Sequence, residues 1–392
     1  MMEYTCIFGG GAIRGLAYIG ALKALEELDV KINTLAGSSV GAIFAGLLAV
    51  GYTCSEIEDI LMKVNFELFK DIHLGKTFGL CKGEIFLEWL QELIEKKFYG
   101  DKYEKGKNSP VTFSDLKKNL VIITTNLAGF CCKEFSNFKT PDVEVAYAIR
   151  ISSTMPGLMP PVKASGAVLV DGDLQKSWPL WKLAPDLSKQ KDRILEFRLE
   201  GDFDVEKHTN IDFVNTVYSC VTSVATKFIV DKYAKKDKFD YLVINTGSTV
   251  IVDFNISDEK RKQLINNGYE QTKEYFEKTL KDKKKNLLQY YLPFSEFLHK
   301  FSDLINTKKY SDAKCEMGEF YMKYIQEISE FADKRLVDDL NTIRDLFLKN
   351  YSVSLLLKKV SLKNSKGIQK RIDILNAELE NKVCELKNYS AS

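Results

Sequence analysis

The first part of the chain alternates between short runs of strand length and longer segments with apolar residues at helical spacing. Residues 4–8 and 33–36 are such runs, and each is followed by glycines and then by a helical pattern, over 14–28 and 40–50. The order of strand, glycine turn and helix therefore occurs twice near the start of the chain. Strands that alternate with helices predict an α/β fold, with a mainly parallel central sheet flanked by helices in three layers.

The same alternation continues further along the chain. Thr53 and Glu56 have the spacing of a capping box and predict the start of another helix. Strands are predicted over residues 120–127, 167–170, 194–199 and 241–245, and helices over 84–98, 213–233 and 258–280.

The character of the chain changes near residue 281. Residues 281–285 carry five charged side chains in a row, which predicts a linker, and no strand pattern follows them. Amphipathic helices are predicted over 314–332, 335–348 and 368–387. We therefore predict two domains, a catalytic α/β domain over 1–280 and an all-α C-terminal region over 281–392.

Composition excludes several classes of protein. With 392 residues, 45% of them hydrophobic and 28% charged, the chain is unlike collagen, a disordered chain or a small disulfide-stapled protein. Its 56 Lys and Arg residues are nearly balanced by 54 Asp and Glu residues, so no global basic field favours a nucleic-acid partner. The eight cysteines show no metal-ligand spacing, so neither a metal site nor a disulfide framework is predicted.

The chain shows no targeting or membrane-spanning pattern. Its N-terminus has neither the basic start nor the apolar core of a signal peptide. The longest apolar run, residues 40–50, is far shorter than the roughly 18 residues that a spanning helix needs. We expect a soluble, cytoplasmic protein that contacts membrane surfaces without crossing them.

Gly37, Ser39 and Gly41 fit the pattern G-x-S-x-G, the nucleophile elbow of serine hydrolases. A strand is predicted before this turn and an apolar helix after it, which is the context in which the pattern exposes a serine. A helix N-terminus also favours the negative charge that develops during attack on an ester. The sequence therefore makes Ser39 a candidate nucleophile.

Three glycines, Gly9, Gly10 and Gly11, end the first predicted strand. Their unhindered N–H groups at a helix start suit the stabilisation of an oxyanion. A nucleotide-phosphate loop is the alternative, but Arg14 stands where G-x-G-x-x-G needs glycine, and the Walker pattern finds neither Lys nor Ser or Thr. Arg14 itself either binds an anionic headgroup or caps local structure.

A serine nucleophile needs a base, and the chain holds three histidines, His73, His208 and His299. The order Ser39, Asp171, His208 would match the triad of ordinary α/β-hydrolases. The other candidate base is Asp171 itself, which follows a predicted strand at the rim of the sheet. An ordinary aspartate, with a pKa of about 3.9, is a weak base, and burial beside the nucleophile would strengthen it. The residues alone leave both bases open.

Four motifs in order resemble those of the patatin-like phospholipases, a family that hydrolyses acyl esters of lipids with a Ser-Asp dyad and no histidine. Residues 9–15 are similar to the family's oxyanion loop, and 37–41 to its nucleophile elbow. Residues 148–161 look like its loop rich in Ser and Pro, and 171–172 like its Asp-Gly motif. The resemblance fades between residues 200 and 280 and does not cover the tail.

The resemblance implies a patatin-like α/β/α domain, with Ser39 as nucleophile, Asp171 as general base and the N–H groups of Gly10 and Gly11 as oxyanion donors. It implies no cofactor and no metal. The expected activity is that of a serine lipid acyl hydrolase of the phospholipase A type, which cleaves fatty-acyl esters of phospholipids through an acyl-enzyme intermediate.

Other features of the site also follow from the resemblance. Gly9 and Arg14 would contact the substrate or its headgroup. Asp173 departs from the family, which has a small residue there, and would either make Asp171 a stronger base or point into water. Residues 176–179 also depart from the family, which usually has asparagines before a proline.

The acyl groove and the tail complete the sequence-based hypothesis. Apolar and basic residues over 352–371 predict either a surface for anionic lipid or the solvated face of a helical bundle.

The alternative function is a patatin-fold scaffold or regulatory binder, with weak or conditional hydrolysis, that acts on a protein partner through 281–392. The residues expected to line the acyl groove are Phe66, Leu68, Phe69, Phe78, Leu80, Leu158 and Met159.

Overall fold

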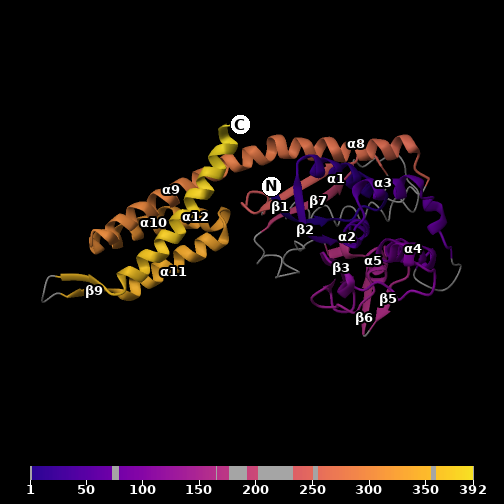
Figure 1. Cartoon of the computed structure of the whole chain (residues 1–392), viewed down its shortest axis with the longest axis horizontal. Helices are drawn as coiled ribbons and strands as arrows, with labels where there is room; N and C mark the ends of the chain where they lie inside the picture. Colours follow the sequence, from indigo (N-terminus) through magenta and orange to yellow (C-terminus); the bar gives the residue numbers. More distant parts are fainter. Residues whose placement is uncertain are drawn as a thin grey trace. The chain divides into compact units, whose positions relative to one another are not determined.

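The computed structural model describes residues 2–72, 79–164, 166–175, 192–201, 233–249, 255–354 and 359–391. The chain divides into two compact units (Figure 1). The first, which we call the α/β unit, comprises Met1–Ala234 and Phe239–Tyr275. The second, the helical unit, comprises Lys235–Lys238 and Phe276–Ser392.

Within the described ranges, eight strands form one sheet at the centre of the α/β unit. The five strands β3, β2, β1, β7 and β8 are parallel to their neighbours in that order, whereas β4, β5 and β6 add antiparallel pairs beside β3. The mainly parallel sheet predicted from the sequence is therefore confirmed. The strands are β1 (Met2–Phe8), β2 (Val30–Gly37), β3 (Asn119–Asn126), β4 (Cys131–Ser136), β5 (Val162–Ala164), β6 (Ala167–Val170), β7 (Arg193–Glu200) and β8 (Phe239–Asn245).

The register of the sheet brings the site motifs together. Phe8 at the end of β1 pairs with Gly37 at the end of β2, so the two glycine turns that follow lie side by side. Val170 at the end of β6 pairs with Thr125 of β3, which is the strand next to β2. The residues that follow β1, β2 and β6 therefore meet at one region of the sheet.

Helices flank this sheet. α2 (Val40–Val50) is buried along most of its length, as its apolar sequence predicts. α1 (Ala17–Glu27) packs closely on α8 (Asp258–Glu274), because a Cβ on Gly20 or Gly268 would lie 1.8 Å from a backbone oxygen of the other helix. Among the described residues, the unit also contains the helices α3 (Cys54–Lys63), α4 (Glu84–Tyr99) and α5 (Val145–Ser152), with short 3-10 helices η1 (Ala12–Leu16), η2 (Phe66–Phe69), η3 (Gly100–Lys102), η4 (Phe113–Asp115) and η5 (Gly172–Gln175).

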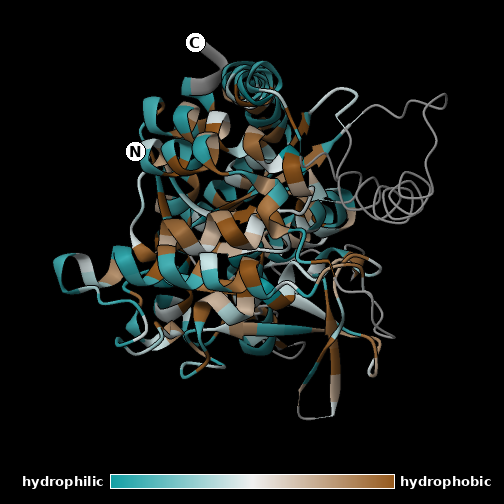
Figure 2. Cartoon of the chain, turned by 90° about the vertical axis from the view of Figure 1, so that its right-hand side faces the viewer, coloured by the Kyte–Doolittle hydropathy of each residue, from teal (hydrophilic) through white to brown (hydrophobic). Residues whose placement is uncertain are grey.

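The helical unit has an apolar core of its own. Stacked aromatic rings occupy it, among them Phe297 and Phe320 with ring centroids 4.0 Å apart. The helices that face the viewer in Figure 2 carry both hydrophilic and hydrophobic segments, as amphipathic helices do. The elements of the helical unit are α9 (Leu280–Asn306), α10 (Tyr310–Phe331), α11 (Lys334–Asn350), β9 (Tyr351–Ser354), β10 (Lys359–Leu362) and α12 (Ser365–Ala391).

Two sequence-based expectations for the tail are corrected. The predicted linker, residues 281–285, is helical and lies in the first turns of α9. The region is helical but not purely so, because β9 and β10 form an antiparallel hairpin. The predicted helix 213–233 lies almost wholly outside the described residues. No helix in the described ranges is both long and apolar enough to span a membrane.

Candidate active site

The turn between β2 and α2 holds Ser39 in a backbone conformation that few residues adopt, with φ 53° and ψ −129°. The flanking glycines are required sterically. A Cβ on Gly37 would lie 2.3 Å from the oxygen of Gly41, and one on Gly41 would lie 2.0 Å from the oxygen of Phe8. The turn therefore has the tight packing and the strain of a nucleophile elbow.

Ser39 and Asp171, which are 132 residues apart in the sequence, meet at this turn. The Ser39 hydroxyl donates a hydrogen bond of 2.6 Å to Asp171 Oδ2. The other carboxylate oxygen accepts the N–H of Asp173 at 2.8 Å, and the Asp171 N–H donates to the oxygen of Thr154. Asp171 is fully buried, whereas Ser39 is 7% exposed. The carboxylate is thus fixed on both sides, with one oxygen directed at the serine.

The segment 148–161 supports the elbow from behind. The Ser152 hydroxyl accepts the N–H of Ser39 at 3.0 Å and donates to the oxygen of Ile123 on β3 at 2.6 Å. Arg150, on the same helix α5, donates to the oxygens of Lys82 and Gly83. The motif recognised in the sequence therefore positions the nucleophile turn through hydrogen bonds.

The three glycines after β1 have different hydrogen-bond partners. The N–H of Gly9 donates to the oxygen of Phe197, and the N–H of Gly10 donates to Asp173 Oδ1 at 3.0 Å. Within the part of the chain that the structure describes, the N–H of Gly11 has no acceptor. The two expected oxyanion donors thus lie beside the elbow, but one of them is engaged.

Asp173 belongs to a buried cluster of charges. Its Oδ1 also accepts the Ser38 hydroxyl at 2.5 Å and lies 3.8 Å from Arg198 Nη1. Arg198 Nη2 forms an ion pair with Glu196, its neighbour on the same face of β7. Asp173 is 1% exposed, so the expectation that it points into water is wrong.

Two pKa shifts describe the electrostatics of this cluster. Burial alone would lower the pKa of Arg198, but the charges of Glu196, Tyr241 and Asp173 raise it above the usual arginine value, so the guanidinium stays charged. Burial, and then the charge of Asp173, raises the pKa of the Tyr18 hydroxyl well above its ordinary value. Tyr18 therefore stays protonated and donates to the oxygen of Gly9 at 2.7 Å.

Other candidate residues lie elsewhere or outside the described ranges. Arg14 Nε donates to the oxygen of Thr249 at 2.8 Å, and Arg14 does not line the cavity beside Ser39. His299 lies in the helical unit, 3.2 Å from Glu380. Two groups of candidates fall outside the described residues: the histidines at 73 and 208, and residues 176–179, which differ from the family pattern.

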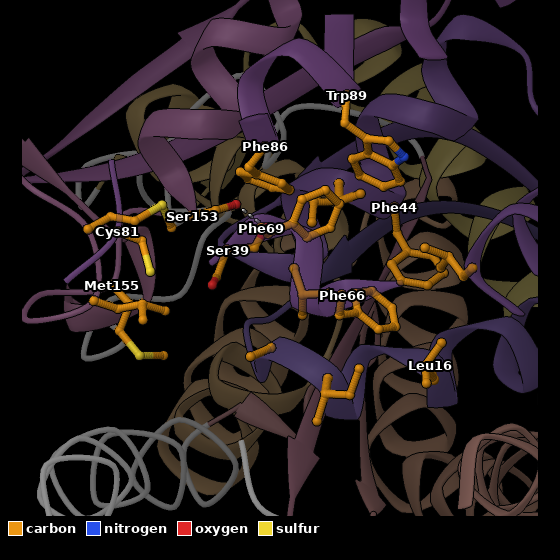
Figure 3. Close-up of a pocket in the computed structure, with 17 residues that line it drawn as sticks. Leu16, Ser39, Phe44, Phe66, Phe69, Cys81, Phe86, Trp89, Ser153 and Met155 are labelled. Atoms are coloured by element: carbon orange, nitrogen blue, oxygen red, sulfur yellow. Dashed lines mark hydrogen bonds between the residues drawn. The ribbon is translucent and has the colours of Figure 1, made fainter. Parts of the chain in front are cut away.

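An apolar cavity opens beside Ser39 (Figure 3). Figure 3 shows the rings of Phe69, Phe86 and Trp89 close together on one side, and Cys81 and Met155 on the other. Ser39 and Ser153 contribute the polar side chains. The lining residues are Ala12, Ile13, Leu16, Ser39, Val40, Ile43, Phe44, Leu61, Phe66, Phe69, Cys81, Phe86, Trp89, Ser153, Met155, Leu158 and Met159.

The expected groove residues have different outcomes. Phe66, Phe69, Leu158 and Met159 line the cavity, but Leu68 and Leu80 do not and are exposed instead. The expected Phe78 lies outside the described residues. Sequence reasoning missed the contribution of α2 and α4, because their apolar residues have the helical spacing of ordinary core positions.

Comparison with known families agrees with the motifs. Residues 6–181 match the family model described as patatin-like phospholipase. The resemblance seen in the sequence is therefore confirmed for this part of the chain. The name of the matching family is that of enzymes that hydrolyse lipid esters.

Individual relatives are distant. Uncharacterized protein R571 of Acanthamoeba polyphaga mimivirus is 28% identical over 279 residues, which cover 68% of this chain and 91% of R571. Probable lipid hydrolase 463L of Invertebrate iridescent virus 6 is 28% identical over 186 residues, 45% of this chain and 61% of that protein. The match therefore spans less than two thirds of 463L.

A solved structure shares the fold. The crystal structure of VipD from Legionella pneumophila has a TM-score of 0.52 with this chain at 16% sequence identity. The match covers 98% of this chain and 90% of VipD. At this level of identity the likeness concerns the fold alone.

Proposed function

We propose that this chain is a serine lipid acyl hydrolase of the phospholipase A type, with Ser39 as nucleophile and Asp171 as general base. The observation that carries the proposal is the 2.6 Å hydrogen bond from Ser39 Oγ to Asp171 Oδ2 beside an apolar cavity. A base within hydrogen-bond reach activates a serine hydroxyl, and an apolar cavity suits a fatty-acyl chain. The match to the family model supports the lipid ester as substrate.

In the acylation step, Ser39 Oγ attacks the carbonyl carbon of the ester while its proton passes to Asp171. The oxyanion that forms is held by the N–H groups of Gly10 and Gly11. When the tetrahedral intermediate collapses, the bond to the glycerol oxygen breaks. That oxygen takes the proton from Asp171, and the lysophospholipid leaves as an alcohol.

In the deacylation step, water attacks the acyl-enzyme carbonyl and gives a proton to Asp171. Collapse of the second intermediate releases the fatty acid, and Ser39 regains its proton from Asp171. No histidine takes part in either step. Asp171 is suited to both transfers because the N–H of Asp173 keeps its other oxygen in place.

The test is turnover of a mixed phospholipid preparation by the full chain, with released products identified by mass spectrometry. We expect fatty acid release to fall by about 10⁴-fold or more in Ser39→Ala. His208→Ala should stay within about threefold of the unmodified protein, because the dyad needs no imidazole. Loss of turnover in His208→Ala would indicate a triad instead. Absence of turnover in the unmodified protein would favour the scaffold function.

We also propose that the enzyme meets its substrate at a membrane surface through an apolar rim, formed by Leu68, Ile72, Leu80 and Ile85. All four side chains are exposed, Ile72 by 66%. The two parts of the rim are tied together, because Ile72 pairs with Cys81 and the Asp71 carboxylate accepts the N–H groups at the start of α4. Their sequence neighbours Phe69, Cys81 and Phe86 line the cavity, so the rim borders its entrance.

For the tail, residues 281–392, we propose a regulatory role in binding a membrane or a partner. Lys363, Lys366, Lys370 and Arg371 are exposed at and before the start of α12, and such a cluster attracts anionic lipid. Reversal of these four charges to Glu should lower binding to anionic vesicles, measured by sedimentation. Unchanged binding would make the cluster a solvated face only.

A further inference from the structure

A second carboxylate occupies the place where the oxyanion would be held. Asp173 Oδ1 accepts the N–H of Gly10 at 3.0 Å and the Ser38 hydroxyl at 2.5 Å. A Cβ on Gly10 would lie 2.2 Å from Asp173 Oδ2 and 2.9 Å from the Cβ of Ser39. The carboxylate therefore lies directly against the glycine loop, close to the nucleophile.

The hydrogen bond between the Gly10 N–H and Asp173 opposes stabilisation of the oxyanion at this site. An N–H group directed at one carboxylate oxygen cannot at the same time be directed at the oxyanion of a substrate. A carboxylate beside a developing oxyanion also repels it, and the repulsion is strong where water is excluded. Asp173 must therefore leave Gly10 before the full oxyanion hole is available.

A partner for the displaced carboxylate is already in place. Arg198 is 2% exposed, its Nη1 lies 3.8 Å from Asp173 Oδ1, and its Nη2 is held by Glu196. Within the described residues, the buried Nη1 group makes no hydrogen bond. A small rotation of the Asp173 side chain toward Arg198 would turn this contact into a direct, charge-assisted hydrogen bond.

Other described groups near Asp173 are directed at partners of their own. Tyr18 from α1 directs its hydroxyl at the oxygen of Gly9, and Asp171 contacts Asp173 through the backbone N–H. Glu196 forms its ion pair with Arg198. Among the residues that the structure describes, Arg198 is therefore the cation placed to draw Asp173 away from the glycine loop.

We propose that Asp173 is a positioning residue that occupies the Gly10 N–H in the resting enzyme and passes to Arg198 as the ester is attacked. This inference rests on the proposed function. The transfer exchanges one hydrogen bond for another and leaves Gly10 and Gly11 both available to the oxyanion. The free energy needed to move the Asp173 carboxylate slows acylation. The rate of acylation therefore depends on which residue stands at position 173.

The test is the rate at which a fluorophosphonate labels Ser39, since its phosphoryl oxygen takes the place of the oxyanion. Asp173→Ala frees Gly10 from the start and leaves Arg198 paired with Glu196. We expect labelling about three- to tenfold faster, a fraction of what one oxyanion donor contributes. With a p-nitrophenyl ester, kcat should rise while KM stays within about twofold. A slower or unchanged rate in a variant of unaltered melting temperature would overturn the proposal.

A double-mutant cycle separates this role from a structural one. Arg198→Gln should slow labelling about tenfold in the unmodified protein, because Asp173 then stays on Gly10. In the Asp173→Ala background the same change should have less than about a twofold effect. Arg198→Lys keeps the charge and should restore most of the rate. An equal loss from Arg198→Gln in both backgrounds would show that Arg198 does not act through Asp173.

The outcomes distinguish this inference from the proposed function. If Ser39 is labelled in the unmodified protein but Asp173→Ala is slower, the proposed function stands and the role of Asp173 is wrong. If no variant is labelled at Ser39, both fall. Labelling of Ser39 in Asp173→Ala alone would support both the proposed function and the role of Asp173. In that case Asp173 would stay on the Gly10 N–H in the unmodified enzyme.

Discussion

The helical unit and the region of the glycine turns in the α/β unit differ in how their buried charges are arranged. In the helical unit, Asp237 accepts the Tyr291 hydroxyl at 2.7 Å and lies 2.9 Å from Lys382 Nζ. Lys284, equally buried, lies 3.0 Å from Glu385. Each of these buried charges has an opposite charge at hydrogen-bond distance, which is the arrangement that stabilises a fold.

The α/β unit instead gathers three buried carboxylates, those of Asp171, Asp173 and Glu196, near its glycine turns. Among the residues that the structure describes, Arg198 is the buried cation beside them. Two of these carboxylates bind the nucleophile turn directly, Asp171 through the Ser39 hydroxyl and Asp173 through the Ser38 hydroxyl. The comparison teaches that buried charges in the helical unit stabilise a packed core, whereas those beside the glycine turns also hold the hydroxyl groups of the site.

The largest effect should come from removing the carboxylate charge beside the nucleophile turn. Asp171→Asn keeps the shape of the side chain but cannot accept the Ser39 proton, so kcat for phospholipid should fall by about 10⁴-fold. The melting temperature should stay within a few degrees of the original, since a buried charge is removed rather than exposed. Initial-rate kinetics and thermal unfolding check both parts. Activity within tenfold of the unmodified enzyme would make Asp171 a structural residue.

Removing a buried charge from the helical unit should instead lower stability. Asp237→Ala removes the acceptor of the Tyr291 hydroxyl and leaves Lys382 with Glu385 as its acidic partner, so the helical unit should lose about 1–3 kcal/mol of stability. Denaturant unfolding measures this loss. Asp338→Ala, at an exposed helical pair with Lys334, is the control and should cost no more than about 0.5 kcal/mol. Equal effects of the two substitutions would remove the contrast between the units.

The sequence predicts the framework of the site well, for physical reasons. Glycines at 9–11, 37 and 41 stand where a Cβ would collide with the backbone or with site side chains, so their spacing reports local geometry. The Thr53 capping box is likewise local, and the structure shows it. Motifs of this kind need no knowledge of distant residues.

Features that depend on distant contacts could not be predicted. The polar run 281–285 is helical, and its Lys284 is buried against Glu385, 101 residues away. Asp71 caps the start of α4 from a separate segment. Glu196 and Arg198 lie on one face of β7, a strand that also carries Arg193 and Glu200 at its two ends. The role of the Arg198 charge depends on its distance from Asp173, which follows another strand.

A larger side chain should have different effects in the cavity of the α/β unit and in the core of the helical unit. Ile43 lies one helical turn after Ser39 and lines the cavity, so Ile43→Trp should cost little stability but block long acyl chains. We expect kcat/KM for a 16-carbon p-nitrophenyl ester to fall about 30-fold, with the acetyl ester within about threefold. Ala313→Leu, in the packed core of the helical unit, should instead destabilise by about 1–3 kcal/mol. Equal losses for both esters would place the acyl chain outside this cavity.

The smallest effect concerns the apolar rim. Replacing Leu68 and Ile72 by Ser should weaken binding to phospholipid vesicles about tenfold, because two side chains lose their burial in lipid. Turnover of a water-soluble acetyl ester should not change. Phe130→Ser, at an 88% exposed residue on the β3–β4 turn, is the matched control. Equal weakening by the control would indicate general hydrophobicity rather than a rim.

The most direct test of the account is to treat the folded full chain with a fluorophosphonate and locate the adduct by peptide mass spectrometry. The account predicts one adduct, on Ser39, formed at least about 100-fold more slowly in Asp171→Asn. An adduct on another residue, or the same labelling rate in Asp171→Asn, would contradict the claim that this serine and this carboxylate act as one catalytic pair.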